Sequence, residues 1–217
     1  CDVVALFRVL RDDAAARTLI SWVRLTPFAR DEFQSAYEPA GDDLEKARRL
    51  LIRSFMGFGS NSHARKTGFR SKTGFRSNSN RSSTTPARDW QNYPDCLAQV
   101  VERWRGVVVE NRPALDVMAT HDGDETLHYV DPPYVPETRD KGRDYNHELS
   151  LDDHHALLTA LRGLKGMVVL SGYPCPIYDE ALADWRRVER KALADGARER
   201  VEVLWINPHA DARFLGA

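Results

Sequence analysis

The chain has 217 residues, of which 42% are hydrophobic and 29% are charged. These values are typical of a soluble globular protein with one sizeable core, with or without a small insertion. The formal net charge is -1, so the chain as a whole does not indicate a nucleic-acid partner. Such a partner would need positive charge gathered in one region.

The composition also argues against a disulfide framework, a metal site and a membrane segment. The three cysteines Cys1, Cys96 and Cys175 are widely spaced and form no C-x-x-C pair, which favours free thiols in a reducing cytoplasm. No apolar run approaches the roughly 18 residues of a membrane span, and the N-terminus lacks the segments of a signal peptide. We therefore expect a cytoplasmic protein without metal or membrane association, and the sequence predicts no oligomeric state.

Hydrophobic periodicity predicts a helical N-terminal part. Residues 2–25 have the helical pattern, either as one helix or as two with the second beginning near Asp13. The pattern begins without a cap, so we expect residues upstream of Cys1 to be missing. After a short mixed stretch, a helix is predicted from the acidic pair Asp42–Asp43 to about Gly57.

A basic segment follows, over residues 63–88. No acidic residue occurs from Ser54 to Arg88, and a hexapeptide, Lys-Thr-Gly-Phe-Arg-Ser, is repeated in tandem from Lys66 to Ser77. Two short copies indicate a lengthened surface loop rather than a solenoid. The basic residues that we expect to contact DNA phosphates or guanine edges are Arg65, Lys66, Arg70, Lys72, Arg76 and Arg81. A solvated loop without a partner is the alternative, and its Phe69 and Phe75 suit either packing or contact with unstacked bases.

Strands and helices alternate in the second half. Strands are predicted at 107–110, 127–130 and 167–171, and helices at about 94–105, 151–164 and 178–184. Ser150 is the candidate N-cap of the second of these helices, with Asp153 completing a capping box. Residues 185–193 and 201–207 are predicted to form an antiparallel hairpin at the sheet edge. The fold class is therefore α/β, with a mainly parallel sheet covered on both faces.

The strongest chemical signal is the tetrapeptide formed by Asp131, Pro132, Pro133 and Tyr134, which follows an apolar strand. Ligands of open α/β sheets bind beyond the carboxyl ends of the strands, where this tetrapeptide would lie. A carboxylate and a main-chain carbonyl at Pro132 can each accept one hydrogen of an exocyclic amino group, which frees the nitrogen lone pair for attack on a methyl sulfonium. Tyr134 can stack on a base that has left the duplex. The alternative is a strand-ending turn with a buried tyrosine.

The chain resembles the Dam-like (D12-class) family of adenine-specific DNA methyltransferases, in particular its phage and prophage branch. The similarity extends over nearly the whole chain, and the segments that carry it are 2–12, 54–57, the Lys-Thr-Gly-Phe-Arg-Ser repeat, 109–112, 131–134, 145–148, 166–173 and 203–208. An aspartate at the first motif position favours adenine, since relatives that act on cytosine more often have serine there and relatives that act on glutamine or guanine more often have asparagine.

The resemblance implies a fold, a cofactor and site residues. It implies a Rossmann-like methyltransferase fold that depends on S-adenosylmethionine, truncated at its N-terminus and with an inserted, mostly helical and loop, target-recognition region. Asp131, Pro132, Pro133 and Tyr134 would be catalytic, and Glu110, Asn111 and Asp131 would bind the cofactor. The family's glycine-rich cofactor loop and ribose-binding acid should lie just before Cys1, so the chain alone is expected to bind the cofactor poorly.

This resemblance divides the chain into three parts. Residues 1–28 would be N-terminal helices of the catalytic domain, 29–104 the target-recognition insertion, and 105–217 the rest of the catalytic domain. The predicted function is transfer of a methyl group to N6 of adenine in double-stranded DNA. A catalytically silent DNA-binding remnant is the alternative, and methylation of RNA or protein is less favoured. Whether a restriction nuclease accompanies the protein stays open.

Several polar residues are weaker candidates. His154 and His155 are adjacent, which favours a solvated first helical turn over a metal site. His121, Asp122 and Asp124 are expected in a polar loop without a function. Tyr145, His147 and Glu148 suit either the target-base pocket or a plain helix entry, and the small residues of Ser171–Tyr173 are expected to leave room for base or cofactor.

Overall fold

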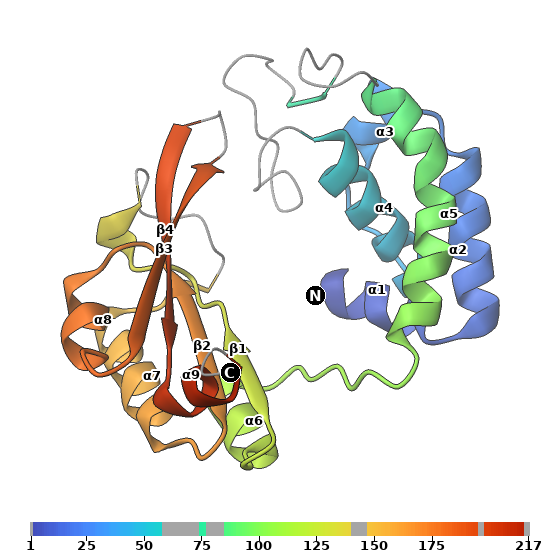
Figure 1. The fold of residues 1–217 in the computed structure, drawn as a ribbon. Helices are drawn as coiled ribbons and strands as arrows, with labels where there is room; N and C mark the ends of the chain where they lie inside the picture. Colours follow the sequence, from blue (N-terminus) through green and yellow to red (C-terminus); the bar gives the residue numbers. More distant parts are fainter. Residues whose placement is uncertain (1, 58–73, 77–84, 140–146, 195–197, 215–217) are drawn as a thin grey trace. The chain divides into compact units, whose positions relative to one another are not determined.

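The computed structural model describes residues 2–57, 74–76, 85–139, 147–194 and 198–214 (Figure 1). The chain divides into two compact units, residues 1–111 and residues 112–217. The described part of the first unit is helical, and the second unit combines helices with a sheet. Each unit has its own hydrophobic core.

Helices build the first unit. Their bounds are α1 Asp2–Leu10, α2 Asp13–Leu25, α3 Arg30–Ser35, α4 Asp43–Met56 and α5 Pro86–Trp104. Of the two arrangements predicted for residues 2–25, the structure has two helices, because the Asp12 side chain accepts the Ala15 N–H at 2.8 Å and caps α2. Asp42 caps α4 in the same way through Glu45.

Helix α5 begins earlier than predicted. Thr85 is its N-cap and Pro86 occupies the first turn, whereas the predicted start, Pro94, lies inside the helix. The prediction was wrong because a proline suits a first turn so well that the interior position is not expected. The longer helix buries Trp90, whose indole N–H donates to the Thr26 carbonyl at 2.8 Å.

Phe75, one of the described residues of the basic segment, packs against the helical unit. Phe75 packs between Phe28 and Phe33, with ring centroids 5.1 and 5.7 Å away, and the Arg30 guanidinium lies 4.9 Å from its ring. Of the two interpretations of this phenylalanine, packing is therefore the one the structure supports. Phe69 lies outside the described residues.

The strand predicted at 107–110 forms no ladder with any described residue, so that prediction was wrong. Val107, Val108 and Val109 are exposed by 41, 76 and 48%. Three valines favour extended backbone, but a strand also needs a partner to satisfy its N–H and C=O groups.

The second unit holds a four-stranded mixed sheet in the order β1-β2-β4-β3. Its strands are β1 Leu127–Val130, β2 Met167–Gly172, β3 Arg186–Ala194 and β4 Arg198–Ile206. The α/β class and the C-terminal hairpin are confirmed. The described sheet is not mainly parallel, because only β1 and β2 run parallel while β4 is antiparallel to both β2 and β3. The sequence does not show that β4 inserts between β2 and β3.

Helices pack on both faces of this sheet. Their bounds are α6 Ala114–His121, the short 3-10 helix η2 Pro136–Thr138, α7 Leu151–Gly163, α8 Pro176–Ala181 and α9 Pro208–Phe214. On the first face, Leu170 and Trp205 are buried against α7 and α8. On the second face, α9 contributes Ala210 to a small cluster with Met167 and Ile206. Edge strand β1 exposes Leu127 by 50% and Tyr129 by 63% on that second face.

The start of α7 follows the prediction in its cap but not in its histidines. Ser150 and Asp153 form the expected capping box. His155 is exposed, but His154 is fully buried and its Nδ1 lies 2.8 Å from the Tyr178 hydroxyl. The prediction of a solvated turn was wrong for His154 because this residue begins the buried i, i+3, i+4, i+7 stripe of the helix.

Two helices of this unit were not predicted: residues 114–121 form α6 and residues 208–214 form α9. His121 was expected in a polar loop, but it is the last residue of α6. Asp122 has a structural role, because its carboxylate accepts the backbone N–H groups of Lys165 and Gly166 at 2.9 and 3.0 Å and pairs with His128. These backbone hydrogen bonds lower the pKa of Asp122.

Candidate active site

The tetrapeptide follows β1 directly, at the carboxyl end of the strand, as predicted. Strand β2 runs parallel to β1 and ends one residue before Tyr173. Because the carboxyl ends of two neighbouring parallel strands lie at the same edge of a sheet, Asp131 and Ser171 are brought together. The sequence places these two residues forty positions apart.

A hydrogen bond joins these two residues. The Ser171 hydroxyl lies 2.8 Å from Asp131 Oδ1 and 3.2 Å from the Val130 carbonyl oxygen. Ser171 is 5% exposed, whereas Asp131 is exposed. The buried hydroxyl thus orients an accessible carboxylate, whose second oxygen has no partner among the described residues.

Tyr134 lies beside this carboxylate and is half-buried. Its ring packs edge-to-face on Tyr173, with centroids 4.7 Å apart. Burial raises the pKa of the Tyr134 phenol well above its usual range, and the carboxylates of Asp131 and Glu202 raise it further. The phenol therefore stays protonated at neutral pH and can donate a hydrogen bond.

The residues after the tetrapeptide hold the loop in place. Val135 is 4% exposed and belongs to the core formed with α7 and α8. Arg139 donates two hydrogen bonds to Glu148, at 3.2 and 2.5 Å. This pairing gives Glu148 a role in the loop, while His147 is exposed and Tyr145 lies outside the described residues.

A cavity of about 370 Å³ opens beside Asp131. Its wall comes from the tetrapeptide, from β1 and β2, and from the hairpin of β3 and β4, through Tyr129, Asp131, Tyr134, Ser171, Arg190, Glu202, Val203 and Leu204. The volume lies in the range of small-molecule sites. Arg190 and Glu202 were not predicted as site residues. Strand alternation was the available signal, but it does not say which face of the hairpin meets the tetrapeptide.

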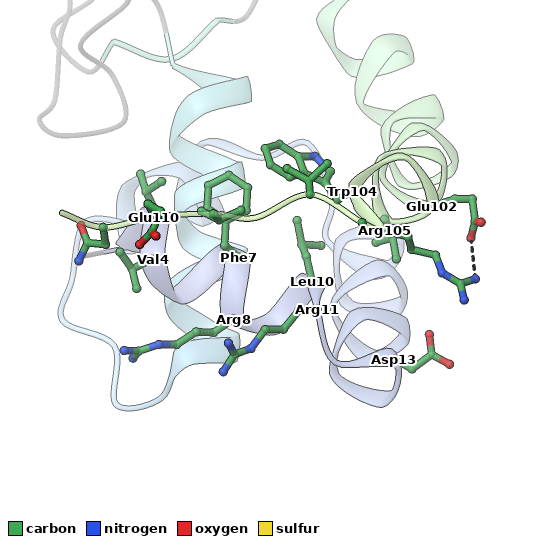
Figure 2. A pocket seen from close by; sticks show the side chains of 16 residues that line it. Val4, Phe7, Arg8, Leu10, Arg11, Asp13, Glu102, Trp104, Arg105 and Glu110 are labelled. Atoms are coloured by element: carbon green, nitrogen blue, oxygen red, sulfur yellow. Dashed lines mark hydrogen bonds and ion pairs between the residues drawn. The ribbon is translucent and has the colours of Figure 1, made fainter. Parts of the chain in front are cut away.

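A second cavity, of about 870 Å³, lies within the first unit (Figure 2). Residues of α1, the end of α5 and the segment 105–111 line it, with Phe7 and Trp104 in ring contact at 4.7 Å. The predicted cofactor residues Glu110 and Asn111 belong to this wall. In Figure 2, Phe7 extends from α1 towards the segment, whereas Arg8 and Arg11 extend the other way.

The three residues predicted to bind the cofactor thus fall in two groups. Glu110 and Asn111 line the cavity of the first unit, and Asp131 lines the cavity of the second unit. The family resemblance assigned all three residues to the cofactor, but the cavities that they line are each built by one unit.

The predicted DNA-binding residues lie mostly beyond what the structure describes. Those outside the described residues are Arg65, Lys66, Arg70, Lys72 and Arg81. Arg76 is described, and its guanidinium donates to the Phe55 carbonyl at 3.2 Å while its backbone N–H donates to Met56 at 2.8 Å. This arginine therefore holds the segment to the end of α4.

The described ranges contain no group of three or more histidine, cysteine or acidic residues placed to hold a metal ion. No helix in them has both the length and the apolar character to cross a membrane. Cys96 is an exposed free thiol and Cys175 a buried one.

Comparison with known proteins gives no family. No protein-family model matches the chain, and no curated protein matches its sequence.

Proposed function

We propose that this protein transfers a methyl group from S-adenosylmethionine to N6 of adenine in DNA, on a Rossmann-like methyltransferase fold. The observation that carries the proposal is the accessible Asp131 carboxylate, held by the buried Ser171 hydroxyl at the carboxyl end of β1 and opening on a cavity with Tyr134. The resemblance to the adenine-specific family supports the same reaction.

In the proposed reaction the main role of the protein is to orient the amino group of the adenine. The amino nitrogen of adenine is a poor nucleophile because its lone pair is delocalised into the ring. The free oxygen of Asp131 accepts one amino hydrogen and the Pro132 carbonyl accepts the other, which draws the nitrogen towards tetrahedral geometry. Pro132 and Pro133 have no N–H groups, so no backbone donor of theirs competes for these acceptors. When the nitrogen attacks the methyl group, the N–C bond would form as the S–CH3 bond breaks, and the electron pair of that bond would stay on the sulfur, which would leave as a neutral thioether. The amino group would then lose one proton to Asp131, which is exposed and can pass it to solvent.

Aromatic side chains complete the base site. The target adenine must leave the helical stack before its amino group can be reached. Tyr134 offers a ring and a protonated phenol to the extruded base, and the exposed Tyr129 borders the same cavity. Base–aromatic stacking contributes about 1–3 kcal/mol per base.

The cavity of the first unit fits the cofactor's chemistry. The cofactor supplies an electrophilic methyl group on a sulfonium. Phe7, Trp104 and Val107 offer the apolar surface that an adenine ring needs, and the Glu110 carboxylate suits ribose hydroxyls or an ammonium group. The Asn111 amide adds a donor and an acceptor at the same wall.

The basic segment 63–88 is the proposed site of contact with the phosphates of duplex DNA. Its lysines and arginines would neutralise phosphates, so binding would weaken steeply as salt is raised. The net charge of -1 over the whole chain makes this local concentration of positive charge the relevant quantity.

The test is transfer of labelled methyl from S-adenosylmethionine to unmethylated DNA. The chain is assayed beside any N-terminally extended form that its gene encodes. Asp131→Ala should lower kcat by about 10²–10³-fold with DNA affinity unchanged, because the carboxylate acts on one extruded base. Asp124→Ala, an exposed acid just before β1, is the matched control and should keep full activity.

Each outcome separates the alternatives. Full turnover by Asp131→Ala would contradict the mechanism. DNA binding without transfer by any form would favour a catalytically silent DNA-binding protein.

A further inference from the structure

We infer that Arg190 of β3 binds the phosphate of the nucleotide whose base enters the Asp131 cavity, so that the β3–β4 hairpin is a second DNA-contacting element. This inference rests on the proposed function. It adds a contact that is separate from the basic segment 63–88 and from the tetrapeptide.

The strand register places Arg190 on the face that carries the cavity. Arg190 lies opposite Glu202, and Leu204, two residues on, lies opposite Ser171. Side chains two apart in a strand share a face, so Arg190, Glu202, Leu204 and Ser171 all lie on the second face of the sheet. This is the face on which Tyr129 of β1 is exposed.

The Arg190 guanidinium is available for a ligand. Its only hydrogen bond among the described residues is to the Glu189 carbonyl, at 3.0 Å. Although Glu202 is opposite in register, the two form no ion pair within the described ranges. By contrast, Arg186 pairs with Asp211 at 3.0 Å and Arg187 pairs with Asp179 at 2.8 Å.

The composition of the cavity points to a nucleotide. Its two tyrosines offer surface to a ring, Asp131 offers an acceptor to an amino group, and Arg190 offers two parallel donors to an anion. Strands β1 and β3 are three strand spacings apart, or about 14 Å at 4.8 Å per spacing. When the Arg190 side chain extends from β3 towards β1, the remaining span can hold a base, its sugar and a phosphate.

Glu202 restricts where that phosphate can lie. A carboxylate repels an anion placed deep between the two residues, so the phosphate must meet Arg190 from the rim of the cavity. Glu202 can then accept a hydrogen bond from a neutral donor of the nucleotide.

The test compares Arg190→Gln with Lys191→Gln in equilibrium binding of a duplex oligonucleotide across a salt series. Lys191 is the next residue of β3, is exposed and lies on the other face, so the two variants change net charge equally. Arg190→Gln should weaken binding about tenfold at low salt and reduce the slope of log affinity against log salt by about one. Lys191→Gln should leave the slope unchanged, and Arg190→Lys should restore most of it.

The results distinguish this inference from the proposed function. An unchanged slope in Arg190→Gln, or an equal fall in both glutamine variants, would overturn the phosphate contact even if the wild type methylates DNA. A fall confined to Arg190→Gln, with no methyl transfer by any form, would uphold the contact and reject the reaction.

Discussion

Gly166 occupies a position that no side chain can share. A Cβ atom there would lie 2.6 Å from the Thr126 carbonyl oxygen, 3.0 Å from that of Gly123 and 3.2 Å from Asp122 Oδ1. Two of these are backbone atoms, and the first would need roughly 1 Å of movement to reach an ordinary contact distance. The same carbonyl accepts the Met167 N–H at 2.8 Å at the start of β2, so it cannot withdraw without weakening the strand.

We expect Gly166→Ala to lower the free energy of unfolding of the second unit by about 2–4 kcal/mol. Overpacking contributes about 1–3 kcal/mol, and each weakened hydrogen bond adds about 1 kcal/mol. For a unit of this size the melting temperature should fall by about 10–20 °C. Thermal unfolding followed by circular dichroism measures this, with urea unfolding as a second probe.

Gly163→Ala is the control, with the opposite sign. Gly163 ends α7, and a Cβ there meets nothing within 4 Å. Alanine is the better helix former, so this variant should gain about 0.5 kcal/mol. A Gly166→Ala protein as stable as wild type would refute the steric argument, as would equal losses in the two variants.

Two further predictions concern His154 and Ser171. Burial lowers the pKa of His154, so the unfolded chain binds more protons and the free energy of unfolding falls as pH drops below about 6.5. In His154→Phe the free energy of unfolding should therefore vary less between pH 7.5 and 5.5, and an undiminished variation would show that other groups cause the pH dependence. Asp122 affects the free energy of unfolding only at lower pH. Its pKa is lowered from 3.8, so its stabilising contribution is lost as pH falls through that lowered value. Ser171→Ala should reduce kcat for methyl transfer about fivefold with DNA affinity unchanged, because losing the hydrogen bond that orients the exposed Asp131 raises the activation free energy by about 1 kcal/mol. An unchanged kcat would show that the hydroxyl does not position the carboxylate.

Local signals in the sequence predicted local structure well. The Ser150 cap was predicted, and the acidic pair Asp42–Asp43 predicted the start of α4, where Asp42 proves to be the cap. Both caps lie within three residues of the N–H groups that they bind, so their sequence context contains the whole interaction. The tetrapeptide was placed correctly after β1 for the same reason, since an apolar run leads directly into it.

Features that depend on distant partners were less predictable. The valines at 107–109 have strand propensity, but pairing decides whether a strand forms. His154 was judged from its neighbour His155, whereas its spacing to the leucines of α7 decides its burial. Arg190 belongs to the candidate site because β4 lies between β2 and β3, an order that the sequence does not show.

The exposed side of β1 has a consequence for the behaviour of the protein in solution. Within the described sheet β1 is an edge strand, and its Leu127 and Tyr129 side chains are exposed. Edge strands with apolar side chains recruit strands from other molecules. Because β1 leads directly into Asp131, recruitment there would occur beside the candidate active site. Specific activity should therefore fall as protein concentration rises, and dilution should restore it.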